Sequence, residues 1–162
     1  MTTGRRDPLD TSLLFDVFAL NQAVGRLLAS AMRDGPLTPS EYAVYSAIFE
    51  LESASPTALA GRLGMRLTTF MDHLRLVEGR GHARRLRNPR DGRSYLVTLT
   101  AGGLDAHRAA NRQFEAAYAA FIAGLDGGEA AGKHALGLIR RAADAVLERE
   151  TVSPHRPAGR AG

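Results

Sequence analysis

Apolar side chains recur at helical spacing near the start of the chain. Between Asp10 and about Arg33 the intervals alternate between four and three residues, which places the apolar positions on one face of an amphipathic helix. This stripe consists of Leu13, Val17, Leu20, Val24, Leu27 and Ala31. Such a helix is about 36 Å long at ~1.5 Å per residue. A small core cannot cover it, so we expect a partner surface.

Shorter helical patterns follow, each with a start signal. The segment Thr38-Pro39-Ser40-Glu41 combines an N-capping hydroxyl, a proline at the first helical position and a glutamate that can close a capping box. Ser55-Pro56 repeats the cap and the proline and opens a helix that stops at Gly64. A further pattern begins at about Leu67, after only two or three residues. Two helices around a tight turn predict a helix-turn-helix.

A predicted β-hairpin follows the second helix of this pair. The segment from Asn88 to Gly92 is dense in turn-forming residues. After it, Tyr95, Val97 and Leu99 alternate with Ser94, Leu96 and Thr98 as the two faces of a half-buried strand do. A helix-turn-helix followed by a basic hairpin predicts a winged helix. From Thr100 two long helical patterns extend to about residue 150, and the glycine- and proline-rich residues 151–162 are expected to form a disordered tail.

Positive charge is concentrated in one stretch. The whole chain carries a formal charge of +4, but the nineteen residues from Arg75 to Arg93 hold seven arginines against two acids. A local basic block in an otherwise balanced chain indicates a surface that binds a polyanion. A merely solvated face is the other interpretation of the same block.

Several chemistries have no support in the sequence. The chain has no cysteine, which excludes disulfides, thiolate metal sites and thiol nucleophiles. The histidines are not paired with each other or with carboxylates at metal-ligand spacing, so we expect no metal site; they are His73, His82, His107, His134 and His155. No catalytic triad, P-loop or dinucleotide motif is visible. We expect no cofactor and no enzymatic activity.

The N-terminal residues and the apolar runs predict a soluble, cytoplasmic protein. Two arginines near the start are followed by Asp10 and Asp16 rather than by an unbroken apolar region, which is not typical of a secretory signal. The longest uncharged apolar run, residues 116–125, falls well short of the ~20 residues that cross a bilayer.

Three anchors at fixed spacing resemble the MarR family of bacterial transcriptional regulators. They are Gly64 and Gly81 on either side of the recognition-helix segment, the Asp91-Gly92-Arg93 turn, and the segment Leu99-Thr100-Ala101-Gly102-Gly103. The resemblance covers about residues 37–108 in detail. The helices outside this range match only as a pattern.

The resemblance implies a mainly α fold with a small β-hairpin (α+β), a winged helix-turn-helix flanked by dimerisation helices. We therefore expect dimerisation helices in residues 1–36 and 101–150 and a DNA-binding domain in residues 37–100. A homodimer would present two recognition helices to a palindromic DNA operator.

Candidate DNA contacts lie on the recognition helix and the hairpin. On the helix, the positions opposite the apolar side chains are expected to face the major groove. Arg75 adds a positive charge to this helix. The candidate site residues are Thr68, Thr69, Asp72, His73 and Arg75. Leu76 shares this face. In the hairpin, Arg85, Arg87 and Arg90 are expected to meet phosphates, and Arg93 to meet phosphate or enter the minor groove. Asp91 is expected to shape the turn.

Two positions depart from the family pattern. Arg66 stands where a small hydroxyl residue usually caps the recognition helix, so capping falls to Thr68 or is weaker. Asp72 stands where a basic or hydroxyl residue commonly faces the groove. A carboxylate there costs affinity unless it accepts from a cytosine amino group or pairs with an arginine such as Arg75.

Aromatic side chains suggest a ligand cleft of the kind the family places between the dimerisation helices and the winged helix. The candidates for binding a small aromatic or amphipathic effector are Phe15, Phe18, Tyr42, Tyr45 and Phe114. The sequence thus favours a ligand-responsive, sequence-specific DNA-binding regulator, most simply a repressor. The alternatives are a sequence-tolerant architectural DNA binder and, less favoured, a small enzyme that uses the pocket.

Overall fold

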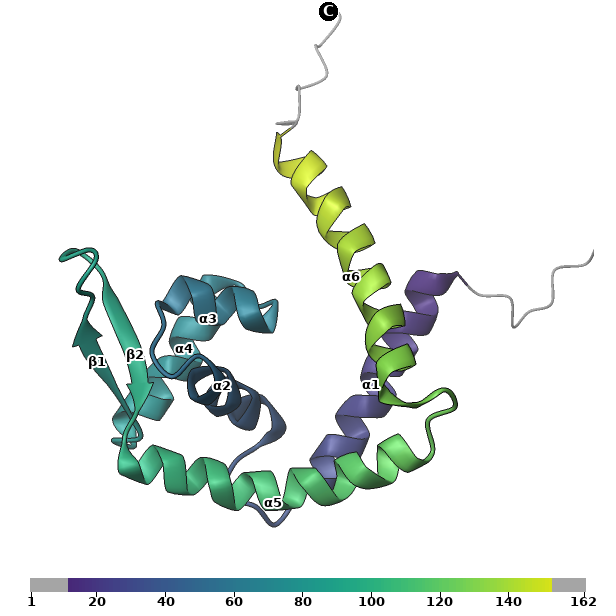
Figure 1. Ribbon diagram of the computed structural model, residues 1–162, viewed down its shortest axis with the longest axis horizontal. Helices are drawn as coiled ribbons and strands as arrows, with labels where there is room; N and C mark the ends of the chain where they lie inside the picture. The colour runs from purple at the N-terminus through teal and green to yellow at the C-terminus, as the bar shows by residue number, and fades with distance from the viewer. Residues whose placement is uncertain (1–11, 153–162) are drawn as a thin grey trace, which may run out of the picture. The chain divides into compact units, whose positions relative to one another are not determined.

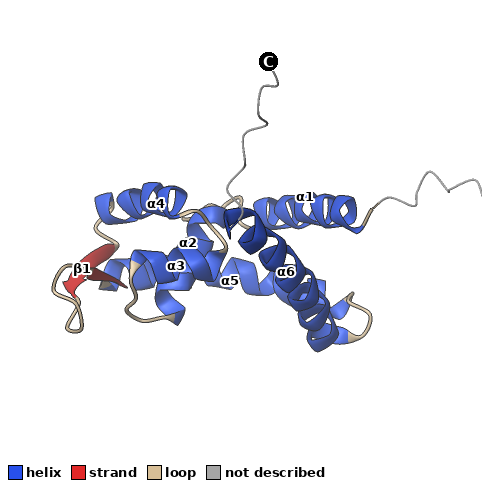
Figure 2. Ribbon diagram, turned by 90° about the horizontal axis from the view of Figure 1, so that it is seen from above, coloured by secondary structure: helices blue, strands red, loops and turns tan. Residues whose placement is uncertain are grey.

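The computed structural model describes residues 12–152, which form six helices and one β-hairpin. The chain divides into two units, residues 1–118 and 119–162. The elements are α1 (Leu13–Ala31), α2 (Pro39–Glu50), α3 (Pro56–Leu63), α4 (Leu67–Gly79), β1 (Ala83–Arg87), β2 (Tyr95–Leu99), α5 (Ala101–Ala123) and α6 (Gly128–Val152). Figures 1 and 2 show helices throughout except for the hairpin, so the prediction of a mainly α winged helix is confirmed.

The helix starts follow the capping signals in the sequence. The Thr38 hydroxyl accepts a hydrogen bond from the Glu41 amide, and the Glu41 carboxylate accepts one from the Thr38 amide, which completes the capping box. The Ser55 hydroxyl accepts from the Ala58 amide at the start of α3. The Ser12 hydroxyl does the same for Phe15, so the described part of the first helix begins three residues after Asp10.

The helix-turn-helix consists of α3 and α4. Gly64 ends α3 in the left-handed conformation, with φ of 65°, which glycine adopts without the steric cost that a Cβ atom adds. Arg66 precedes α4 and makes no side-chain capping hydrogen bond. The start of α4 is therefore weakly capped, as Arg66 suggested, and within the described residues no hydrogen bond from the Thr68 side chain replaces the missing cap.

The wing is a two-stranded antiparallel hairpin with Ala83 opposite Leu99 and Arg87 opposite Tyr95. A single bridge between Ala54 and Val97 joins β2 to the segment before α3. Val97 and Leu99 are buried, which confirms the alternation read from the sequence. The loop between the strands extends beyond the neighbouring helices (Figure 1).

The core of the first unit lies where α2, α3, α4 and β2 meet. Its largest fully buried side chains include Tyr45, Ile48, Leu59, Phe70 and Leu74. Each of the three helices contributes an apolar face to this core, while Ala110 of α5 covers one side. The core thus fixes how α4 and the wing are presented.

The segment that joins the wing to α5 explains one sequence anchor. The Thr100 hydroxyl donates to the Gly81 carbonyl (2.7 Å) and accepts from the Gly103 amide (3.2 Å). A Cβ atom on Gly103 would lie 2.0 Å from the His82 carbonyl oxygen. Threonine and glycine at these positions therefore let α5 pack directly against the start of β1.

The terminal helices leave most of their apolar side chains exposed. No residue of α1 is buried, and Leu13, Leu14, Phe15, Phe18 and Leu20 are all exposed. On α6, Leu136, Leu138, Val146 and Leu147 are exposed as well. Helix α6 continues to Val152, so the first two residues of the expected tail are helical, and residues 153–162 lie outside the described residues.

Helix α1 is strongly apolar. Among helices in residues 12–152, it is the one that is long and apolar enough to cross a membrane by length and composition, although it carries charged residues such as Asp16 and Arg26. A search for uncharged apolar runs does not select this helix, because Asp16 and Arg26 interrupt it. Length and composition alone are weak evidence, and a strongly apolar face is also what a helix needs to pack against a partner.

Candidate nucleic-acid interface

The outward face of α4 carries the side chains expected to meet DNA. Thr68, Thr69, Asp72 and Leu76 are exposed, whereas Phe70, Leu74 and Val77 on the opposite face are buried. His73 is only half exposed and lies at the edge of this face. Figure 2 shows α4 at one edge of the group that it forms with α2 and α3.

Asp72 forms an ion pair with Arg75, one helical turn further along α4. Arg75 Nη1 donates to Asp72 Oδ1, and both side chains remain largely exposed. The sequence suggested two partners for this carboxylate, a cytosine amino group and Arg75. The pair with Arg75 already forms in the protein without DNA.

Arg85, one of the arginines expected to meet a phosphate, is paired with Glu78 within the protein. Its Nε and Nη2 donate to the two carboxylate oxygens of Glu78 at 2.7 and 2.9 Å. Its guanidinium also lies 4.4 Å from the centre of the Tyr95 ring. The hydrogen bonds to Glu78 raise the pKa of Arg85. The strand register explains this placement, because Arg85 faces Val97 on the side of the hairpin that meets α4.

Four other arginines of the wing form no ion pair with any residue in the described part of the chain; they are Arg84, Arg87, Arg90 and Arg93. All four are exposed. Arg84 was not among the expected phosphate contacts, although it belongs to the same basic block. Strand register was the missing information, since it places Arg84 opposite Thr98, on the other face from Arg85.

The wing tip is held by short-range hydrogen bonds. Asp91 Oδ1 accepts from the Arg93 amide at 3.0 Å, and the Asp91 carbonyl accepts from the Ser94 amide at 3.1 Å. Asn88 Oδ1 accepts from the Arg90 amide, and Asn88 Nδ2 donates to Ser94 Oγ. These bonds give Asp91 the turn-forming geometry expected of it and fix the backbone that carries the two arginines.

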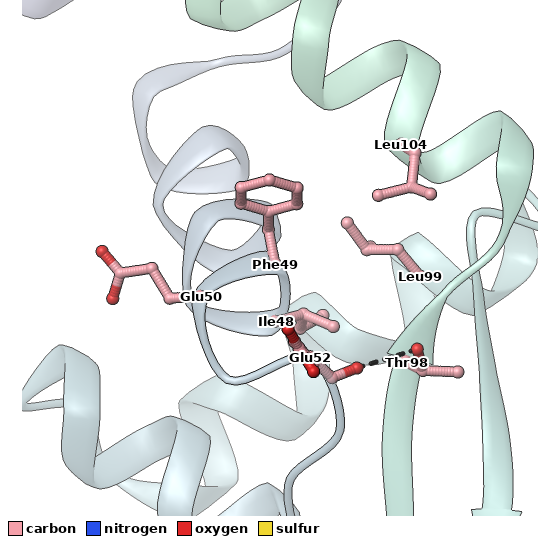
Figure 3. A pocket seen from close by; sticks show the side chains of 7 residues that line it. All are labelled: Ile48, Phe49, Glu50, Glu52, Thr98, Leu99 and Leu104. Carbon is pink, nitrogen blue, oxygen red and sulfur yellow. Dashed lines mark hydrogen bonds between the residues drawn. The ribbon is translucent and has the colours of Figure 1, made fainter.

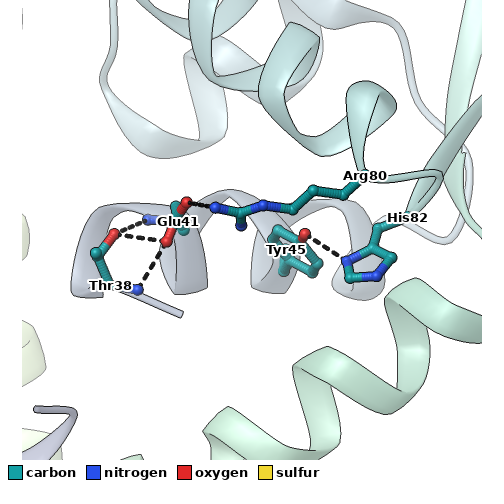
Figure 4. A network of polar contacts seen from close by, with 5 residues as sticks. All are labelled: Thr38, Glu41, Tyr45, Arg80 and His82. Carbon is teal, nitrogen blue, oxygen red and sulfur yellow. Dashed lines mark hydrogen bonds and ion pairs between the residues drawn. The ribbon is translucent and has the colours of Figure 1, made fainter. Parts of the chain in front are cut away.

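A polar network links the start of α2 to the end of α4 (Figure 4). Arg80 Nη2 donates to Glu41 Oε1 at 2.6 Å, and the Tyr45 hydroxyl lies 2.9 Å from His82 Nδ1. Burial tends to raise the pKa of Glu41, but hydrogen bonds from Thr38 and Arg80 outweigh it and lower that pKa overall. The network fixes the recognition helix to α2. Sequence patterns did not reveal it because Glu41 and Arg80 are 39 residues apart.

His107 is the one buried histidine in the described part of the chain. Its Nε2 lies 3.1 Å from Ser46 Oγ, and its ring stacks on Tyr42 and Phe49 of α2. Desolvation, reinforced by the charge of Arg108, lowers the pKa of His107. It therefore stays neutral near pH 7 and serves as a packing element between α2 and α5.

A cleft of about 320 Å³ lies between α1, α2, α3 and α5. Tyr42 and Phe114 line it as expected, with their ring centres 5.0 Å apart. Arg62 and Glu50, which pair at 2.7 Å, also line it. Three expected residues are elsewhere. Tyr45 is fully buried in the core and lies against His82, while Phe15 and Phe18 are exposed on α1 and line neither of the two clefts described here.

A second groove of about 410 Å³ lies between the end of α2, β2 and the start of α5 (Figure 3). Phe49, Leu99 and Leu104 point toward one another across it, whereas Glu50 points away. Thr98 Oγ1 donates to the Glu52 carbonyl at its lower edge. Within residues 12–152, no cluster of three or more potential metal ligands is present, and His155 lies outside that range.

Comparisons with known proteins agree on a regulator of the winged-helix type. No protein-family model matches the chain. A curated relative, the HTH-type transcriptional regulator TtmR of Methylorubrum extorquens, is 36% identical over 103 residues, which cover 62% of this chain. The chain spans about half the length of that relative, since the match covers 53% of it.

Two solved structures show the same fold. The PcaV transcriptional regulator of Streptomyces coelicolor, solved with its natural ligand, is 27% identical, with 88% of this chain and 99% of PcaV covered and a TM-score of 0.70. A mutant of MarR from E. coli, solved with operator DNA, is 22% identical, with 80% and 99% covered and a TM-score of 0.66. The helix-turn-helix, the arginine-bearing wing and these similarities together show that the chain has the winged-helix fold of the MarR-type regulators to which it is similar.

Proposed function

We propose that this chain is a sequence-specific DNA-binding transcriptional regulator that acts in the cytoplasm. The observation that carries the proposal is the position of an exposed recognition-helix face and four unpaired wing arginines on the same unit. The helix would contact base edges in the major groove, while the arginines would neutralise phosphates. The MarR structure with operator DNA supports this assignment by similarity of fold.

The protein would act as a homodimer on a palindromic operator. The exposed apolar side chains of α1 and α6 need a surface to cover them, and a second copy of the chain provides an equally apolar one. Two copies would present two α4 helices to half-sites about one DNA turn, roughly 34 Å, apart. The dimerisation helices of the sequence analysis, residues 1–36 and 101–150, remain the proposed contact regions.

A small aromatic or amphipathic effector would bind in the cleft lined by Tyr42 and Phe114 and release the operator, so that the protein is a repressor. Residues of α1, α2, α3 and α5 line the cleft, so a ligand there can favour one arrangement of these helices. A group that competes with Glu50 for Arg62 would be anionic. PcaV, solved with its natural ligand, supports the existence of such a site in a similar fold.

The coupling between effector and operator is testable in both directions. A thermal-shift screen of phenolic compounds would identify ligands, and each would be retested against DNA binding. A coupling of about 1–3 kcal/mol corresponds to a 5- to 150-fold loss of operator affinity, and operator DNA must weaken ligand binding by the same factor. Ligands that stabilise the protein but leave operator affinity unchanged would show that the cleft has no regulatory role.

A sequence-tolerant architectural DNA binder is the main alternative, because it would use the same basic wing. Fluorescence anisotropy at fixed salt, with a selected operator and a scrambled duplex of equal length, separates the two functions. A specific regulator binds the operator about 10³-fold or more tightly than the scrambled DNA, whereas an architectural protein binds both nearly equally. A small enzyme is disfavoured because the relatives are transcriptional regulators and the cleft residues form no catalytic constellation.

A further inference from the structure

The centre of the outward face of α4 holds two side chains of opposite charge. Successive residues of an α-helix are rotated by about 100°, so Asp72 and Arg75 both lie on the side away from Phe70 and Leu74. Their side chains are 70% and 67% exposed, and each is the other's ion-pair partner. A helix that docks in the major groove would therefore carry this pair into the groove.

The pair sets the direction of the arginine. Asp72 lies one turn closer to the N-terminus of α4, so the bond between Arg75 Nη1 and Asp72 Oδ1 draws the guanidinium back along the helix. In helix-turn-helix proteins the N-terminal residues of the recognition helix contact the base edges. The pair thus holds a positive group toward the end of α4 that is nearest the bases.

Part of the guanidinium remains available. Asp72 engages Nη1 of Arg75, and no protein group accepts a hydrogen bond from its Nε or Nη2 within the described residues. Arg85 shows what these two atoms can do, because its Nε and Nη2 hold both oxygens of the Glu78 carboxylate. Guanine presents two acceptors, N7 and O6, at matching spacing in the major groove.

We propose that Arg75 reads a guanine in each operator half-site and that Asp72 is the positioning residue that aims it. The carboxylate also repels a phosphate, whereas the guanine acceptors are uncharged. This inference rests on the proposed function and goes beyond it by naming the base that the Arg75 side chain selects. It also gives the acidic residue on the DNA-facing surface a role.

Selection from a pool of duplexes with randomised sites tests the proposal by measuring base preference at every position. The wild-type chain should enrich a guanine at one position of each half-site. Arg75→Ala should lose the preference at that position alone, by about 5- to 150-fold, the worth of one bidentate contact. Arg75→Lys should lose most of it, because an ammonium group cannot form the planar two-donor contact.

The Asp72 variants distinguish a positioning role from a direct contact. Asp72→Ala should weaken the preference at the same base pair by about 2- to 5-fold, the worth of an exposed ion pair, and raise affinity for random DNA. Asp72→Asn retains an acceptor oxygen for Arg75 and should therefore keep most of the guanine preference that Asp72→Ala loses. Arg108→Ala is the matched control, because Arg108 forms an equally exposed pair with Asp105 three residues earlier on α5.

Unchanged base preference in Arg75→Ala, with the wild-type protein enriching a sequence, would overturn this inference and leave the proposed function standing. A change at a different base pair in Asp72→Ala would show that Asp72 reads DNA itself and is not a positioning residue. If the wild-type protein enriches no sequence at all, sequence-specific regulation itself fails. Circular dichroism of each variant would confirm that its helical content is intact.

Discussion

Phe70 and Phe18 both lie on the apolar face of a helix, yet Phe70 is fully buried while Phe18 is 60% exposed. Phe70 belongs to α4, whose apolar face packs against α2 and α3 inside a single unit. Phe18 belongs to α1, none of whose residues is buried. The winged helix therefore completes its own core, whereas α1 and α6 leave most of their large apolar side chains exposed.

The largest effect is expected in the self-contained region. Phe70→Ala should lower the free energy of unfolding by about 3–5 kcal/mol, because the ring is fully buried and the space it leaves cannot close completely. Chemical denaturation at several protein concentrations measures this loss. A loss below about 1 kcal/mol would contradict the described core.

The next effect should separate the two regions. Leu20→Glu places a carboxylate on the exposed stripe of α1 and should weaken dimerisation by about 2 kcal/mol or more, since the charge would be buried without a partner. Size-exclusion chromatography over a range of concentrations measures the shift toward monomer. Gln22→Glu, an exposed polar position on the same helix, is the control. Equal behaviour of the two variants would remove α1 from the interface.

A pH effect is expected where α5 packs on α2. The pKa of His107 in the folded protein lies below the ordinary value of 6.5 that the unfolded chain retains. Below pH 6.5, the unfolded chain therefore binds a proton at His107 more readily than the folded protein does. Stability should therefore fall as the pH drops below 6.5, by at most about 1.4 kcal/mol per pH unit. Denaturation at pH 7.5 and 5.5 measures the loss, and His107→Gln should show less of it. The same loss in this variant would exclude His107 as its source.

The smallest effect on stability is expected at the wing tip. Arg93 is exposed and unpaired in the described part of the chain, so Arg93→Ala should leave the unfolding free energy within about 0.5 kcal/mol of wild type. Its effect should appear on DNA, where loss of one phosphate contact reduces the slope of log affinity against log salt by about 0.9. Arg108→Ala should leave this slope unchanged. An unchanged slope in Arg93→Ala would mean that the wing does not contact the backbone.

The local features of this fold are readable in the sequence. Thr38 and Ser55 predicted two helix starts, and the turn around Asp91 predicted the wing, because capping and turn formation depend on neighbouring residues. The pairing of Arg85 with Glu78, the burial of Tyr45 and the link from Glu41 to Arg80 were not predictable in this way. Each depends on strand register or on how separate helices pack, which periodicity within one segment does not contain.

Sedimentation velocity of the full chain with a labelled operator duplex tests most directly whether the protein binds its operator as a homodimer. A homodimer that binds a palindromic operator should give a free species of about twice the 17.4 kDa chain mass at micromolar concentration and a complex of two chains per duplex. A monomer that binds the operator as a single chain would contradict it, because the apolar faces of α1 and α6 would then need another explanation.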